Sequence, residues 1–405
     1  MTPAAWPQVR LDSVAEVRLG RQRSPKHHTG THMRPYVRAA NVGWNGLLLD
    51  DVKTMNFTDA EMEVYGLRPG DLLLGEASGS AKEVGKPAVW SGEIESCAFQ
   101  NTLLRVRPHG PDARYLLHYF RFQAESGGFA RRSRGVGIYH LGREALASLD
   151  VPLPPVAEQR RIAAVLDQAD ALRAKRREAL VLRDALTESI FNSLFGTSPY
   201  TPVTIGHDLV PHPAGWRWEL LTDVARLATG HTPDREVPDY WDGDIPWISL
   251  TEIRDLDGKV ALDTTLRVSQ KGIDNSSSVL LPEGTVCFSR TASLAFVTLM
   301  GRQMATSQDF VNWVCGERLC PAYLMHALIR SRARLRALST GSTHKTIYMR
   351  VAEQFRVLVP PLALQQEFAE RIAAVDAQRR RLERSAERLD ELFASLQQRA
   401  FRGEL

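Results

Sequence analysis

The most regular hydrophobic pattern in the chain lies near its C-terminal end. Apolar residues recur there every seven positions, and a second apolar row lies four residues further on, interrupted only by Arg379. Two rows with this spacing are typical of a coiled-coil helix, because they form one apolar stripe along it. The first row is Phe368, Val375, Leu382, Leu389 and Leu396, and the second is Ile372, Ala386, Phe393 and Ala400.

A second long helix is predicted about 200 residues earlier in the chain. Each helix follows a proline pair, Pro154-Pro155 or Pro360-Pro361. Proline fits the first turn of a helix and disfavours helix just before it, so each pair predicts a sharp start. The earlier helix is less regular, and its middle is basic around Arg173, Lys175, Arg176 and Arg177. Its apolar residues are Ile162, Val165, Leu166, Ala169, Leu172, Leu182, Leu186, Ile190 and Leu194.

The two helices belong to a longer internal repeat. Similar segments recur 206 to 214 residues apart, always in the same chain order. A period of this length indicates two similar domains produced by tandem duplication, since solenoid repeats are only about 20–50 residues long. The matching pairs begin at Trp6 and Trp216, Gly20 and Gly230, Leu67 and Leu281, Tyr115 and Tyr323, and Gln159 and Gln365.

Each repeat combines a mixed domain with one long helix. Short β-like runs such as DLLLG, NTLLRV and DFVNWV alternate with Gly/Pro punctuation and one short helix, which predicts the α+β class. We expect domains at 1–153 and 198–359 and long helices at 154–197 and 360–405. A helix of about 38 residues is roughly 57 Å long, too long for its own domain to bury. The helices are therefore predicted to form an antiparallel coiled coil with pseudo-twofold symmetry, and the alternative is that each docks separately on its own domain.

Composition limits the function only weakly. The 51 basic and 47 acidic residues give a net charge of +4, which permits a polyanionic partner without requiring one. The four cysteines lack metal-ligand spacing, so no metal site is predicted. The sequence has no apolar run that would suit a signal peptide or a membrane span, so we expect a cytoplasmic protein without membrane association.

The sequence carries no recognisable catalytic motif. The segment GSAKEVGKP from Gly79 has the wrong glycine spacing for a phosphate-binding loop, and Pro87 stands where Ser or Thr would hold Mg²⁺. The prolines of LPPV and VPPL lack the flanking residues of an adenine methyltransferase motif. His118 and His326 occupy equivalent repeat positions and are interpreted as structural. We therefore predict no catalytic residue and no cofactor held by this chain, which favours a binding protein.

The whole chain resembles the specificity subunits of type I restriction–modification enzymes. The resemblance rests on PLPPVAEQRRI and VPPLALQQEFAERI at the helix starts, and on TGHTPDREVPDYWDGDIPWISLTEI, LRPGDLLL and GSTHKTIYM. It implies two target-recognition domains that each read one half of a bipartite DNA site. It further implies that the helices set the unread spacer and bind two modification (adenine methyltransferase) subunits, and that restriction (translocase–nuclease) subunits join the complex. S-adenosylmethionine, ATP and Mg²⁺ would then belong to the partner subunits.

Two other readings stay open on the sequence alone. One is a self-contained DNA enzyme, and the other is a coiled-coil adaptor that scaffolds proteins without sequence-specific DNA binding. Purified chain without any activity would argue against the first. Binding of duplex DNA together with a methyltransferase subunit would argue against the second.

Candidate DNA contacts are basic, polar and aromatic residues in loops, because such side chains contact phosphates and base edges. The alternative for each is an ordinary solvated or packing residue. In the first domain the candidates are Arg21, Arg23, Lys26, His27, His28, Lys82, Lys86, Arg131, Arg132 and Arg134. In the second they are His231, Arg235, Tyr240, Trp241, Arg290, Ser342, His344 and Lys345. The candidate partner contacts on the helices are Gln159, Arg173, Arg176, Arg177 and Gln365.

Overall fold

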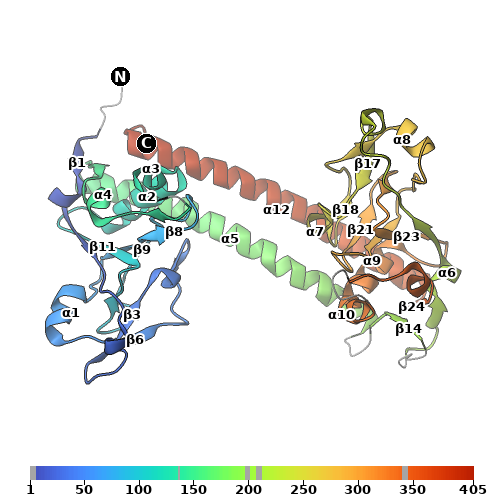
Figure 1. Cartoon of the computed structure of the whole chain (residues 1–405), viewed down its shortest axis with the longest axis horizontal. Helices are drawn as coiled ribbons and strands as arrows, with labels where there is room; N and C mark the ends of the chain where they lie inside the picture. The colour runs from blue at the N-terminus through green and yellow to red at the C-terminus, as the bar shows by residue number, and fades with distance from the viewer. Residues whose placement is uncertain (1–5, 136, 197–200, 207–211, 340–344) are drawn as a thin grey trace. The chain divides into compact units, whose positions relative to one another are not determined.

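The chain folds into two compact units. The computed structural model describes residues 6–135, 137–196, 201–206, 212–339 and 345–405, without the side chains of residues 181–185. The first unit comprises Met1–Leu180 and Arg381–Leu405, and the second comprises Val181–Arg380. The long helices α5 (Val156–Phe195) and α12 (Leu362–Arg402) each contribute residues to both units (Figure 1).

The described part of the first unit contains five small sheets, and three of them form the scaffold that recurs in the second unit. An antiparallel sheet has the order β2-β11-β7-β9, a mixed sheet has the order β10-β3-β6, and β1 pairs with β13. The bounds of the first sheet are β2 (Ala15–Leu19), β11 (Leu103–Pro108), β7 (Leu72–Gly75) and β9 (Pro87–Val89). Those of the others are β10 (Ala98–Phe99), β3 (Met33–Val37), β6 (Lys53–Asn56), β1 (Gln8–Arg10) and β13 (Asp150–Pro152). The helices are α1 (Asp59–Tyr65), α2 (Ala113–Glu125), α3 (Gly128–Arg132) and α4 (Arg143–Ala147).

The second unit repeats this scaffold. Its main sheet has the order β16-β23-β20-β21-β18, its mixed sheet the order β19-β17-β22, and its third sheet the order β14-β24-β15. The main sheet contains β16 (Ala225–Thr229), β23 (Phe310–Cys315), β20 (Val286–Ser289), β21 (Val297–Met300) and β18 (Val260–Ala261). The other strands are β19 (Arg267–Val268), β17 (Ile245–Ile248), β22 (Ala305–Thr306), β14 (Val203–Ile205), β24 (Phe355–Val359) and β15 (Arg217–Leu220). The helices are α6 (Leu221–Val224), α7 (Ile253–Leu256), α8 (Gln270–Asp274), α9 (Pro321–Arg330), α10 (Arg332–Ala337) and α11 (Met349–Ala352).

The strand orders confirm the predicted duplication and the α+β class. The order β2-β11-β7-β9 recurs as β16-β23-β20-β21, and the parallel pair β10·β3 recurs as β22·β17. Gly20 and Gly230, which occupy equivalent repeat positions, are required to be glycine for the same structural reason. A Cβ at Gly20 would lie 2.2 Å from the carbonyl oxygen of Gln100, and one at Gly230 would lie 2.2 Å from that of Thr306. Only glycine allows this close passage of two backbone segments.

Each long helix begins directly after its proline pair, at Val156 and at Leu362. In the first unit the two helices run antiparallel, because Arg161 bonds the carbonyl oxygen of Leu405 while Arg173 pairs with Asp390. In the second unit the pairing of Phe191 and Phe195 of α5 with Phe368 of α12 agrees with that direction. The predicted contact between the helices is confirmed.

The helix ends also pack on the short helix of each unit. The alternative of two helices docked separately is wrong, because the helices contact each other. In the first unit Phe393, Ala400 and Phe401 of α12 join the core around α2 (Figure 1). In the second unit Phe191 and Phe368 join the core around α9. The apolar stripe is buried at these ends, whereas Leu172 and Leu186 of α5 are 51% and 45% exposed.

Candidate nucleic-acid interface

The loop that follows β2 contains five of the predicted contacts, and Arg21 among them is part of the fold. Its side chain is 8% exposed, lies 2.6 Å from a Glu61 carboxylate oxygen and covers the Phe57 ring at 4.8 Å. It also donates to the carbonyl oxygen of Asn56. These internal bonds assign Arg21 to holding the loop in place, in contrast to the DNA contact predicted from sequence.

The rest of that loop is open to solvent. Arg23, Lys26 and His28 are exposed, and Nε of Arg23 lies 3.2 Å from Nε2 of His28. His27 is half-buried, and desolvation together with the nearby Arg21 and Lys26 charges lowers its pKa. The loop therefore presents several cationic or polar groups from one short stretch of chain.

The two lysines of the glycine-rich segment differ in position. Lys82 is exposed, whereas Lys86 is 2.5 Å from Glu83 and lies 5.8 Å from the centre of the Trp44 ring. The Trp44 indole donates to the same glutamate at 2.7 Å. Lys86 is thus engaged inside the unit, and Lys82 alone of the pair is available to a ligand.

A basic hollow of about 240 Å³ lies beside α3 and α4. It is lined by Arg132 and Arg134, which the sequence singled out, and by Arg143, which it did not. The backbone of Arg134 pairs with His140, and Nδ1 of His140 lies 3.3 Å from Glu76. Arg131 is exposed on α3 and bonds a carbonyl oxygen of its own turn. Arg143 could have been found from its place in the first turn of a short helix, which its repeat counterpart Arg350 shares.

The second unit places the equivalent loop against the same part of its scaffold. Thr346 pairs with Thr291 just after β20, as Tyr139 pairs with Ser78 just after β7. Arg290 is half-buried and bonds the carbonyl oxygen of Gln308, while Lys345 is exposed. The predicted contacts Ser342 and His344 lie outside the described residues. Within the described part, the fold brings Arg290 and Lys345 to one edge.

The aromatic segment after β16 forms a packed corner. Trp247 is 1% exposed, and Trp241 stands edge-on to it with ring centres 5.0 Å apart. The Trp241 indole donates to the carbonyl oxygen of Asp234, and the exposed Arg235 covers its ring at 5.8 Å. The other two candidates of this segment, His231 and Tyr240, are half-buried. Trp241 therefore supports the loop, and Arg235 is its outermost charged group.

The two glutamines that were predicted to contact a partner instead form hydrogen bonds inside the fold. Gln159 is 2% exposed, accepts a hydrogen bond from the Asp112 amide at 2.8 Å and donates to the Pro154 carbonyl at 2.7 Å. Gln365 is 0% exposed and bonds the Cys320 amide and the Pro360 carbonyl at the same two distances. Burial and these bonds correct the predicted partner role, because each amide is occupied in tying its long helix to the start of the short helix.

The basic middle of α5 divides into buried and exposed groups. Arg173 is 9% exposed, lies 2.5 Å from Asp390 and covers the Phe393 ring at 4.3 Å, so it joins the two helices within the first unit. This corrects its predicted role as a partner contact. Arg177 is exposed and lies 3.3 Å from Asp390, and Arg176 is half-buried.

Metal and membrane features are limited. Among the described residues no group of three or more His, Cys, Asp and Glu side chains could hold a metal ion. In the same part of the chain no helix has the length and apolarity that a membrane crossing requires.

Comparisons with known proteins agree on one family. The family described as the type I restriction modification DNA specificity domain matches residues 3–181 and 213–392. The specificity subunit of the StySPI enzyme of Salmonella potsdam is 21% identical over 428 residues, covering 100% of this chain and 90% of that protein. The EcoKI specificity subunit of Escherichia coli K12 is 23% identical, covering 92% and 82%. The match to the MjaIX specificity subunit of Methanocaldococcus jannaschii is 24% identical and spans 40% of this chain and 38% of that protein.

Solved structures share the fold at low identity. The specificity subunit from M. genitalium is 12% identical and superposes with a TM-score of 0.58 over 99% of both chains. A chain from a study of complex assembly and conformational transition of the type I R-M system is 18% identical, with a TM-score of 0.61 over 100% of this chain and 99% of that one.

Proposed function

The chain belongs to the family of type I restriction–modification DNA specificity subunits, and we propose that each of its units reads one half of a bipartite DNA site. The recognition domains would be residues 1–153 and 198–359, with the long helices between and after them. A specificity subunit is the non-catalytic component of its complex, in accord with the absence of catalytic motifs from the sequence.

One observation carries the proposal: the same scaffold occurs twice with different loops. Three sheets of the first unit have counterparts in the second, where β18 and β14 each add one strand. The segment after β2 reads RQRSPKHHTGTH, whereas the segment after β16 reads HTPDREVPDYWD. A shared scaffold with unlike loops suits two half-sites of different sequence, because side chains in the loops determine which base edges are read.

The long helices would hold the two readers at one separation. A helix of 40 residues rises about 60 Å, and equivalent groove faces of DNA recur about every 34 Å. A stiff connection of this length supports a fixed number of unread base pairs between the half-sites.

Exposed basic side chains are the best candidates for DNA contact. Phosphate contacts need free cationic groups, whereas Arg21 and Lys86 are engaged internally. We propose DNA contact through Arg23, Lys26, His27, His28, Lys82, Arg131, Arg132, Arg134 and Arg143 in the first unit, and through His231, Arg235, Tyr240, Arg290, Ser342, His344 and Lys345 in the second.

The remaining chemistry would belong to partner subunits. Two modification subunits would dock on the helices and methylate adenine after flipping it from the duplex. Restriction subunits would complete the complex, which would act on DNA in the cytoplasm. S-adenosylmethionine, ATP and Mg²⁺ would bind these partners.

Footprinting tests this proposal. Purified chain, with and without co-expressed modification subunit, is incubated with a library of random-sequence duplexes, and bound DNA is sequenced and footprinted. We expect the complex to protect two short half-sites separated by an unprotected stretch of fixed length. Selection of a single continuous sequence, or of no sequence, would contradict it.

A further inference from the structure

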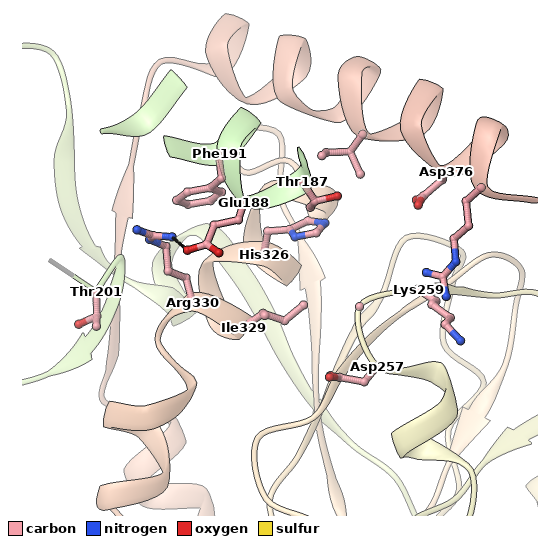
Figure 2. A pocket seen from close by; sticks show the side chains of 13 residues that line it. Thr187, Glu188, Phe191, Thr201, Asp257, Lys259, His326, Ile329, Arg330 and Asp376 are labelled. Atoms are coloured by element: carbon pink, nitrogen blue, oxygen red, sulfur yellow. Dashed lines mark hydrogen bonds and ion pairs between the residues drawn. The ribbon is translucent and has the colours of Figure 1, made fainter. Parts of the chain in front are cut away.

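Each unit contains a cavity at an equivalent place, between a short loop, the short helix and α5 or α12. The cavity of the second unit has a volume of about 690 Å³ (Figure 2). That of the first unit has a volume of about 390 Å³. Both are lined by repeat counterparts: Gly46 and Gly258, His118 and His326, and Asp170 and Asp376. The difference in volume therefore arises from the other residues around these shared walls.

In the first unit an aromatic ring packs against two residues that line this space, His118 and Arg121. Phe393 of α12 is 1% exposed, and its ring centre lies 6.4 Å from that of His118. The guanidinium groups of Arg121 and Arg173 cover the same ring at 5.4 Å and 4.3 Å. Asp390, one turn before the phenylalanine, lies 2.5 Å from Arg173. A phenyl ring with a carboxylate one turn away thus completes the first unit.

In the second unit the walls remain but the ring is absent. Thr187 of α5 stands 206 residues before Phe393, at the equivalent position. Thr187 lines the cavity together with His326 (Figure 2). Arg379 lines it as well, and His326 and Arg379 are the counterparts of two residues that hold the ring in the first unit. Two further substitutions widen the space, because Ile329 replaces Arg121 and Leu256 replaces Trp44.

The second unit has phenylalanines of its own, but they fill a different place. Phe191 and Phe368 stand at the positions of Gln397 and Ile162 in the first unit. Their rings pack against each other at 5.5 Å, one helical turn along α5 from Thr187. Of the two, Phe191 lines the cavity.

The chemistry of the walls suits an aromatic group. Burial lowers the pKa of His326 to about 4, so its ring is neutral at physiological pH, and its Nε2 has no hydrogen-bond partner among the described residues. The ring stands edge-on to Phe368 at 5.2 Å. A neutral aromatic wall favours another ring.

The helix surface next to the cavity is also apolar. Leu186, the residue before Thr187, is 45% exposed, and its repeat counterpart Leu392 is 50% exposed. Exposed leucines at equivalent positions of both repeats are expected where two copies of one partner cover both repeats.

We propose that the cavity of the second unit receives an aromatic side chain from a modification subunit docked on the long helices. The inference rests on the proposed function, since it names a contact of the proposed partner. The first unit supplies its own ring from Phe393, so the two bound copies of the partner make different contacts. An inserted aromatic anchor in a preformed pocket is the kind of contact that dominates binding energy.

The test fills the cavity from within. Thr187→Phe places on α5 the ring that the first unit carries at the equivalent position, and Ser189→Phe adds the same ring at an exposed position two residues away. Each variant is co-expressed with the modification subunit, and stoichiometry is followed by native mass spectrometry over a dilution series. We expect wild type and Ser189→Phe to bind two copies, and Thr187→Phe to bind one copy normally and the other at least tenfold more weakly.

Two other outcomes distinguish failure of this inference from failure of the proposed function. Two copies bound by Thr187→Phe with wild-type affinity would overturn the inference and leave the proposed function intact. No binding by wild type would remove both together. If Thr187→Phe lowers the melting temperature, Ile329→Arg decides instead, because it places in the cavity the side chain that Arg121 supplies in the first unit. Tenfold weaker binding of one copy supports the inference, and unchanged binding overturns it.

Discussion

Replacing Gln365 by leucine should destabilise the free chain. The side chain is 0% exposed, accepts from the Cys320 amide at 2.8 Å, and donates to the carbonyls of Pro360 at 2.7 Å and Arg318 at 3.2 Å. Leucine fills a similar volume but leaves these buried groups unpaired, at about 1–3 kcal/mol each. Part of that loss is offset by the added apolar burial, about 1 kcal/mol. We expect a net loss of about 2 kcal/mol or more.

The assay is thermal unfolding of the free chain, and the matched control is the neighbouring Gln366→Leu, since Gln366 is exposed. For a unit of roughly 200 residues the expected loss lowers the melting temperature by roughly 4 °C or more, whereas the control should change little. If Gln365 were a partner contact, as its sequence position suggests, Gln365→Leu would match the control in the free chain and weaken only partner binding. That result would refute the stabilising role of the buried Gln365 hydrogen bonds.

Three further expectations concern other parts of the molecule. Phe393→Ala should lower the free energy of unfolding by about 3–5 kcal/mol, because its ring is 1% exposed between α12 and α2. Urea unfolding measures this loss, and a loss below about 1 kcal/mol would mean that the contact is not formed in solution. Arg134→Ala and Lys345→Ala should each weaken DNA binding by the complex similarly on all sequences and reduce the salt slope by about one; titrations at several salt concentrations check this, and unchanged affinity would remove these residues from the interface. The pKa of His326 is lowered to about 4, so the unfolded chain binds a proton at higher pH than the folded chain does, and stability should fall by up to about 3 kcal/mol as pH drops from about 6.5 to 4. His326→Gln should lack this part of the pH dependence in urea titrations, and an identical profile would show that the histidine is solvated.

The architecture was predictable because short sequence patterns determine its main features. Pro154-Pro155 and Pro360-Pro361 end directly before α5 and α12, since proline restricts the backbone wherever it stands. The repeat spacing predicted two similar domains, and the strand orders of the two units agree. Gly230 recurs at the spacing of Gly20 because both positions lie against a neighbouring backbone.

The candidate site was less predictable, because the sequence does not reveal which polar side chains turn inward. The sequence places Arg21 in a loop and predicts a DNA contact, but Glu61 and the Phe57 ring hold its side chain inside the fold. Gln365 reads as a repeated surface residue, and its repetition reflects a buried joint. Arg143 joins the basic hollow only because the fold brings α4 beside the loop that contains Arg134.

Mapping DNA methylation in a host that carries this chain with its modification subunit tests the central claim most directly. A matched host that expresses the modification subunit without the chain is the control. The account predicts methylated adenines in a single bipartite sequence, with two different half-sites at a fixed spacing, and none of these in the control. Methylation in a continuous site, or the same methylation without the chain, would contradict it.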